Sequence, residues 1–417
     1  MRYLKASIIC GVLAFLLSAG LFELGAFRGL DAGLAIFIEQ PSPPTVERLL
    51  QYALMLCASM GIAWTTIDIG RASLKFVVAL VALAECATMT WVADMFDAYF
   101  SPVGTMCAIG FAFLFGFIYS QSPPGRRKQE IYRLLGDRVS ASTFNSLLDC
   151  DLPLKFEGEE RDASVMVCEV FNHEQLVGAM RINDYVAMMN SFLRNSADLL
   201  VEKGAYLDEC DGETLRVVFG APLPDGAHPL RACEAALALA ERLDAVNQEC
   251  HQVWGRMFDY RIGINSGEMI MAAYGSGRMG TFSVTGESVE FARRLCIANT
   301  IYGSRILVGA STFNAAEGSV EVRPMELIQR FADPMQREEV YELLGLAGGL
   351  PESESLRRDH FWKGVIFYRG QRWAEALAQF CSAREITGSD GPSEFYIQRI
   401  EQLRAGVPLL DWNRSRL

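Results

Sequence analysis

The stretch GAYLDECDGETLRVVFG, Gly204–Gly220, decides how the centre of the chain folds. Its Asp211-Gly212 pair is a strong turn signal, and the apolar run Leu215–Phe219 after it is typical of a strand. Upstream, Ala163–Val170 has the alternation of a strand, with Val165 and Val167 on one face. We therefore expect a β-hairpin beside a further strand, with Asp208 and Asp211 as solvated carboxylates that flank the turn.

Helices and strands alternate around this hairpin. Residues 179–202 have a helical apolar period, and residues 232–246, ACEAALALAERLDAV, predict an amphipathic helix. Residues 260–276, YRIGINSGEMIMAAYGS, are interpreted as strand, turn and strand. This order predicts an α+β sandwich in which helices cover a mixed sheet.

Three segments of this region resemble the active-site segments of the class III nucleotide cyclases, the adenylyl and guanylyl cyclases, of the bacterial membrane-bound type. They are the hairpin itself, RDASVMVCEV before it and FSVTGESVEFARRL after it. The similarity runs from Glu157 to Leu344 and includes RIGINSGE, VVFGAPLP and YGSRILVGAST in the family's order. The resemblance implies a class III cyclase-like domain with a ferredoxin-like α+β fold, which works as a dimer.

The resemblance also implies a reaction and a set of metal positions. In this family the ribose 3′ hydroxyl attacks the α-phosphate and expels pyrophosphate, assisted by two divalent ions that two Asp residues hold. These two metal positions correspond to Glu169 and Glu213. The Gly-Phe-Thr of the family's phosphate loop is replaced by Asn172-His173-Glu174. Mg²⁺ or Mn²⁺ is the implied cofactor if the chain is active.

The remaining positions act across the family's dimer interface. The two base-reading positions correspond to Glu209 and Ser283, the ribose-positioning Asn to Glu290, and the transition-state Arg to Arg294. Only Arg294 is the residue that active relatives use. Glu209 is the residue type of guanylyl cyclases, but glutamate replaces so many of these residues that its presence here indicates little about base preference.

These replacements predict a weakened site. A glutamate carboxylate lies roughly 1.5 Å farther out than an aspartate carboxylate, whereas Mg²⁺ demands near-ideal octahedral geometry. A side chain in place of the loop glycine is expected to fill the approach to the phosphates. Over the mapped charged positions the formal charge is −3, which repels a triphosphate. His173 is interpreted as a surface residue, with metal ligand or base as the alternative.

Two functions from different classes follow. The first is a catalytically impaired, dimerising pseudocyclase with a regulatory or nucleotide-binding role. The second is an active purine nucleotide cyclase with Glu-held metals, working alone or as the metal-supplying half of a heterodimer with an intact cyclase. A nucleoside triphosphate is a candidate ligand in both, whereas the net charge of −12 argues against nucleic acid as a partner.

The first 122 residues predict a membrane region. Four apolar runs are long enough to cross a bilayer as helices: Ala6–Phe27, Leu49–Ile69, Leu74–Val92 and Val103–Tyr119. Lys and Arg gather before the first run, between the second and third, and after the fourth, which predicts cytoplasmic termini in a multi-pass protein of the inner membrane. Glu23 and Glu85 are ionisable residues inside these runs, and Glu85 is a candidate for a functional role.

The predicted organisation has four parts. Residues 1–122 are the four-helix transmembrane region, and residues 123–150 a linker helix whose basic start can contact anionic lipids. Residues 151–347 are the cyclase homology domain, and residues 348–417 resemble a tetratricopeptide-like helical tail that packs on that domain. The 11 cysteines show no metal-ligand spacing and are interpreted as packing residues.

Overall fold

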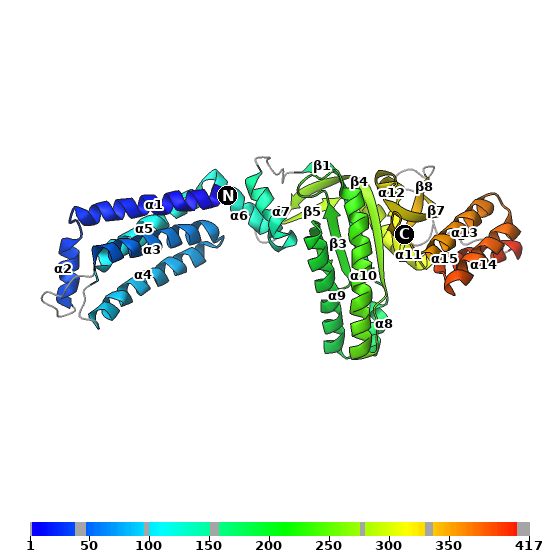
Figure 1. Cartoon of the computed structure of the whole chain (residues 1–417), viewed down its shortest axis with the longest axis horizontal. Coiled ribbons are helices and arrows are strands. Elements are labelled where there is room, and N and C mark those ends of the chain that lie inside the picture. Colours follow the sequence, from blue (N-terminus) through cyan, green and yellow to red (C-terminus); the bar gives the residue numbers. More distant parts are fainter. Residues whose placement is uncertain are drawn as a thin grey trace. The chain divides into compact units, whose positions relative to one another are not determined.

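A computed structural model describes residues 2–37, 47–95, 100–150, 158–275, 280–329 and 337–406 (Figure 1). The chain divides into two compact units. The first comprises residues 1–133 with 148–150, and the second comprises residues 134–147 with 151–417. Each unit has its own apolar core.

The first unit is helical. Its helices are α1 (Arg2–Glu23), α2 (Arg28–Phe37), α3 (Arg48–Asp68), α4 (Ala72–Asp94), α5 (Pro102–Gln121) and the start of α6 (Pro123–Leu135). Four of these, α1, α3, α4 and α5, are long and apolar enough to cross a membrane, which confirms the four predicted runs. Small side chains such as Ala14, Ala63 and Ala112 let the helices approach closely at the centre of the bundle. The short helix α2, by contrast, falls in a loop for which no helix was predicted.

The linker is broken where its prolines lie. Helix α5 ends at Gln121, and α6 begins at Pro123 after the extended residue Ser122. A residue before proline is disfavoured in the helical region, and proline suits the first turn of a new helix. Helix α6 is followed by a 3₁₀ turn, η1 (Gly136–Arg138), and by α7 (Ala141–Asp149). Val139, which the apolar spacing included in one linker helix, lies after the turn in extended backbone.

The second unit is built on one mixed sheet. Its described strands are β1 (Glu159–Val170), β2 (Tyr206–Asp211), β3 (Thr214–Phe219), β4 (Tyr260–Tyr274), β5 (Thr281–Thr285), β6 (Ile306–Gly309), β7 (Val320–Gln329) and β8 (Arg337–Leu346). They follow the order β2-β3-β1-β4-β6-β8-β7, and β5 pairs with β4. The predicted hairpin is β2 and β3, which pair antiparallel around Gly212.

Helices pack against both faces of this sheet. They are α8 (His173–Ala179), α9 (Ile182–Glu202), α10 (His228–Trp254), α11 (Glu287–Tyr302) and α12 (Ala310–Ala316). Figure 1 shows α9 and α10 running along one face of the sheet, where Phe192, Leu239 and Ile262 contribute to the main core. The α+β class and the helical tail predicted from the sequence are therefore confirmed.

The turn predicted inside residues 260–276 was wrong. Strand β4 runs unbroken from Tyr260 to Tyr274, and it pairs with β1 along most of its length. Within this strand Gly267 allows close packing. Its φ is +151°, and an added Cβ would lie 2.7 Å from the Ser288 hydroxyl of α11.

The C-terminal helices α13 (Glu352–Arg369), α14 (Trp373–Thr387) and α15 (Gly391–Arg404) share a core with the cyclase-like sheet. Phe361, Phe380 and Tyr396 of these helices pack with Leu295 of α11 and Met325 of β7. The tail is thus part of the second unit. Its likeness to a tetratricopeptide repeat stays a prediction.

A buried ion network, which we call the tail joint, fastens these helices to the sheet. It consists of Arg323, Glu342, Asp390 and Arg357. The Arg323 guanidinium donates to Glu342 Oε2 at 2.5 Å and to both oxygens of Asp390 at 2.8 and 3.0 Å. Asp390 also accepts from the backbone N–H of Ser393 and so caps α15. Every member of the joint has an ionic partner of opposite sign.

Candidate functional site

The two carboxylates at the metal positions lie on neighbouring strands. Glu169 on β1 is in register with Thr214 of β3, and the Val170 N–H donates to the Glu213 carbonyl at 3.0 Å. The hairpin turn therefore places Glu213 next to the end of β1. Burial raises the pKa of Glu169, and the nearby Glu213 carboxylate raises it further, although Arg293 acts in the opposite direction. Glu169 consequently holds a proton more readily than an exposed glutamate does.

His173 lies beside this pair. Its Nε2 is 4.0 Å from Glu213 Oε1, and its Nδ1 is 3.2 Å from the Val170 carbonyl oxygen. The side chain is half-buried, not fully at the surface as the sequence suggested. It occupies the phosphate-loop position at which the family has Phe, so the altered loop brings an imidazole to a metal-position carboxylate.

Asn172 replaces the loop glycine without strain. Its φ is −96°, which any residue adopts. The side-chain amide donates to the Met257 carbonyl at 3.0 Å, and its oxygen accepts from the Asp259 N–H at 2.8 Å. The expectation that this side chain fills the phosphate approach needs correction, because both ends of the amide are held against residues 257–259. Asn172 fixes the loop to the segment before β4.

The first base-reading position is neutralised from within the hairpin. Arg216 of β3 lies 2.9 Å from Glu209 Oε2 and donates to Asp208 Oδ2 at 2.6 Å. Asp208 is buried, so its expected place as a solvated turn carboxylate was wrong; only Asp211 is exposed. Sequence reasoning missed Arg216, although a single arginine within the apolar strand LRVVF was a usable signal.

The second base-reading position, Ser283, lies on β5 and pairs with Ala272 of β4. Strand β5 is fastened to β2 by Tyr206, whose hydroxyl donates to the Phe282 carbonyl at 2.5 Å. The structure thus brings together the two strands that carry Glu209 and Ser283.

Arg138 of the η1 turn joins the same two strands. Its Nη1 donates to the Asp208 carbonyl at 2.8 Å and to Thr281 Oγ1 at 3.2 Å. One guanidinium from the segment before the domain therefore contacts both β2 and β5. Within the second unit, the turn and the base-reading strands are held as one piece.

On α11 the two mapped residues point to different surroundings. Glu290 is exposed, and Arg293 Nε lies 3.4 Å from its Oε2. Arg294 is only 6% exposed, and its Nη2 donates to the Gln329 carbonyl at 3.1 Å. Burial lowers the pKa of Arg294. Arg294, at the position of the family's transition-state arginine, therefore contacts a backbone carbonyl of its own chain. Arg293 is the exposed arginine of this helix turn.

These residues fit a divalent metal poorly. Glu169 is half-buried with a raised pKa, and Glu213 has the His173 imidazole beside it. Across the described residues, no three His, Cys, Asp or Glu side chains gather closely enough to hold an ion. Mg²⁺ prefers ionised carboxylates in strict octahedral geometry. A raised carboxyl pKa and a longer side chain both work against that requirement.

Comparison with known proteins identifies the domain. Residues 157–329 match the family described as adenylate and guanylate cyclase catalytic domain. Adenylate cyclase 1 of Rhizobium meliloti is 21% identical over 195 residues, which are 47% of this chain and 29% of that protein. An uncharacterized protein of Mycobacterium tuberculosis is 28% identical over 199 residues, 48% of this chain and 33% of its own.

Among solved structures, the guanylyl cyclase Cya2 is 22% identical with a TM-score of 0.43, covering 46% of this chain and 96% of that one. The chain spans about a third of the length of the curated relatives it matches. The family match over residues 157–329 includes all six mapped site positions. These residues therefore form the part of the chain that matches the adenylate and guanylate cyclase catalytic domain family.

Proposed function

We propose that this protein is a membrane-anchored, dimerising pseudocyclase that regulates cyclic-nucleotide signalling and has little or no turnover of its own. One observation carries the proposal. At the metal positions, the structure has a half-buried Glu169 with a raised pKa next to Glu213 and His173.

The metal argument is the strongest. Phosphoryl transfer of this kind depends on ions that activate the attacking hydroxyl and offset the charge of the phosphates. A raised carboxyl pKa lowers the affinity for a cation, since the metal competes with a proton. Burial raises the pKa of Glu169 and the Glu213 carboxylate raises it further, although the Arg293 charge acts in the opposite direction.

The charge of the base-reading and ribose positions also supports the proposal. Arg216 compensates Glu209, but Glu290 remains an exposed carboxylate where the family uses an amide donor. A carboxylate cannot donate a hydrogen bond to a ribose oxygen. Removing one well-placed donor from a transition state costs about 3–4 kcal/mol in the best-studied sites. Several such changes together leave little catalysis.

The structure supports anchoring as well. Four helices of sufficient length and apolarity precede the domain, and the positions of the basic residues around them support cytoplasmic termini and a cytoplasmic cyclase domain under the positive-inside rule. Because the family's site is shared between two subunits, we expect the chain to form a homodimer, or a heterodimer with an intact cyclase. Lipid contacts of the basic linker belong to the same proposal.

Production of the full-length chain in a bacterial strain without its own cyclase tests this function. We expect cyclic AMP and cyclic GMP, measured by mass spectrometry, to stay at the level of a matched Glu213→Ala strain. Cysteine cross-linking in the same membranes is expected to recover a dimer. Cyclic nucleotide that accumulates with the wild-type chain and is lost with Glu213→Ala would overturn the proposal.

The adjacency of Glu169 and Glu213 favours the alternative of an active cyclase with Glu-held metals. The two carboxylates lie on paired strands, as a two-carboxylate metal site requires. The same strain distinguishes a half-site enzyme from a pseudocyclase. In this test the chain is coproduced with a cyclase that lacks only its two metal-binding aspartates. Product is restored only if this chain supplies working metal ligands.

A further inference from the structure

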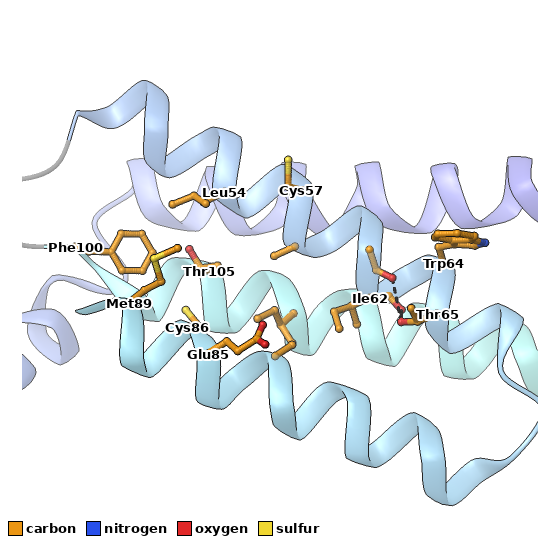
Figure 2. A pocket seen from close by; sticks show the side chains of 14 residues that line it. Leu54, Cys57, Ile62, Trp64, Thr65, Glu85, Cys86, Met89, Phe100 and Thr105 are labelled. Atoms are coloured by element: carbon orange, nitrogen blue, oxygen red, sulfur yellow. Dashed lines mark hydrogen bonds between the residues drawn. The ribbon is translucent and has the colours of Figure 1, made fainter. Parts of the chain in front are cut away.

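An open cavity of about 420 Å³ lies between α3, α4 and α5 of the first unit, and Glu85, Trp64 and Met89 of its lining are exposed. Figure 2 shows its length, with Leu54, Met89 and Phe100 towards one end and Ile62 and Trp64 towards the other. Its walls are predominantly apolar. Pockets of this size and lining are typical of sites for small ligands.

A single carboxylate lies at the middle of this cavity. Glu85 is on α4, inside the apolar segment Ala72–Ala93, and its side chain lies among the lining residues in Figure 2. Within the described part of the chain, the carboxylate oxygens have no hydrogen-bond or ion-pair partner. An ionisable side chain at this depth of a membrane is costly and usually has a function.

Two of the other polar groups of the wall are engaged by the chain itself. Thr65 Oγ1 donates to the carbonyls of Gly61 and Ile62 at 3.0 and 3.1 Å, and Cys86 Sγ lies 3.6 Å from the Pro102 carbonyl. Among the lining residues, Glu85 is the one ionisable as a carboxylate, and so it is the group that can fix the orientation of a charged molecule in the cavity.

The second glutamate of the membrane region, Glu23, has partners among the described residues, in contrast to Glu85. Glu23 near the end of α1 accepts a hydrogen bond from the Tyr52 hydroxyl and lies 3.9 Å from Arg48. It is therefore satisfied by the chain itself. Glu85 has the same chemistry, but its surroundings are an apolar cavity.

We propose that this cavity binds a membrane-soluble amine, with the hydrocarbon body against the apolar wall and the ammonium paired with Glu85. Charge complementarity selects the class: a cation offsets the carboxylate, an acid or phosphate is repelled, and a neutral alcohol leaves the charge uncompensated. The proposal goes beyond the proposed function. It requires the helices to lie in a bilayer, and it is independent of whether the cyclase domain turns over.

Equilibrium binding of tritiated decylamine to the full-length chain in phosphatidylcholine nanodiscs tests it, with empty nanodiscs subtracted. We expect saturable binding that excess decylamine displaces and that decanol and decanoate displace only at about tenfold or higher concentration. Binding that does not saturate, or equal displacement by all three, would overturn the proposal. Because the readout is binding, the result does not depend on cyclase activity.

Two matched pairs of variants locate the site. Glu85→Gln is expected to weaken decylamine binding by about tenfold or more, whereas Glu23→Gln leaves it unchanged. Ala82→Phe, in the cavity wall, is expected to abolish binding, whereas Leu80→Phe, which faces outward on the same helix, is not. If the Glu85→Gln and Glu23→Gln variants bind alike while both remain folded by circular dichroism, the ammonium does not pair with Glu85.

Discussion

Two clusters of charged residues in the second unit, the tail joint and the metal positions, differ in how completely their charges are matched. In the tail joint, Arg323 and Asp390 are both almost fully buried and face each other through two hydrogen bonds. At the metal positions, Glu169 is only half-buried, and its nearest carboxylate neighbour, Glu213, has the same sign. The ion pairs of the tail joint stabilise the fold, whereas the two like charges at the metal positions do not.

The pKa values express the same difference. Although burial of Asp390 acts in the opposite direction, the guanidinium of Arg323 lowers its pKa, so Asp390 stays ionised in the folded protein. Burial raises the pKa of Glu169, so ionisation there opposes folding. Perturbed pKa values of this kind cluster at functional sites. Glu169 is at one of the two metal positions that the resemblance to the cyclase family implies.

The largest expected effect is in the tail joint. Asp390→Ala leaves Arg323 buried without its bidentate partner, which typically destabilises a protein by about 3–5 kcal/mol. We expect a correspondingly large fall in the thermal unfolding midpoint of the full chain. Asp359→Ala, which removes a surface partner of Arg358, is the control and should change stability by less than about 1 kcal/mol. Equal effects of the two variants would contradict the comparison.

A second prediction concerns Arg216, which pairs with Asp208 and Glu209 in the β2–β3 hairpin. Arg216→Ala leaves the buried Asp208 carboxylate without its ionic partner. We expect a loss of about 2–3 kcal/mol, since an unsatisfied buried charge carries a large desolvation cost. Thermal unfolding measures it, and Arg216→Lys should recover part of the loss. If Arg216→Ala does not change stability, the pairing of Arg216 with Asp208 does not stabilise the fold, and this pair resembles the metal positions more than the tail joint.

The third prediction is a gain. Glu169→Gln removes a carboxylate whose ionisation the fold disfavours, so we expect it to be neutral or to stabilise the protein by up to about 1 kcal/mol at neutral pH. The stability that the raised pKa contributes is present below the ordinary value of 4.5 and is lost as pH rises. The advantage of the variant should therefore grow from pH 4.5 to pH 7.

Asp390 provides the opposite pH dependence. Its pKa is lowered from 3.8, so its contribution is present above that value and is lost as pH falls. Unfolding of Asp390→Asn should thus diverge from that of the wild type at neutral pH and approach it only when the measurement is extended below pH 3.8. Parallel profiles for the Glu169 and Asp390 variants would remove the distinction between the clusters.

The smallest expected effect is that of Arg293→Ala. The side chain is about half exposed and its pair with Glu290 is on the surface, so we expect a change in stability below about 1 kcal/mol. Its charge nevertheless lowers the pKa of Glu169. Infrared titration of the carboxyl groups should show the pKa of Glu169 moving upward in this variant and unchanged in Arg372→Ala, an exposed arginine of the tail.

Much of this architecture could be predicted because its signals are local. The Asp211-Gly212 turn, the helical period of residues 179–202 and the four apolar runs each depend on neighbouring residues, and all appear in the structure. The turn predicted within residues 260–276 was wrong, because this segment pairs with β1 as one continuous strand, and Gly267 leaves room there for Ser288, which is distant in sequence.

The site was less predictable for the same reason. The six mapped positions came from resemblance, but the partners that set their chemistry come from elsewhere in the chain. Arg216 pairs with Glu209 across the hairpin, His173 reaches Glu213 from another loop, and Arg294 is engaged by the Gln329 carbonyl. Including Arg216, Asp208 and Arg293 changes the formal charge of the mapped cluster from −3 to −2. Residue types alone could not supply these pairings.

The central claim is that this altered site does not carry out cyclisation. The most direct test is an assay of the purified full-length chain in lipid vesicles with Mn²⁺ and each of ATP, GTP, CTP and UTP, with products identified by mass spectrometry. Mn²⁺ suits carboxylate ligands and gives an imperfect site its best opportunity. We predict no cyclic product with any of the four nucleotides. Turnover that disappears in both Glu169→Ala and Glu213→Ala would contradict the account and identify the substrate.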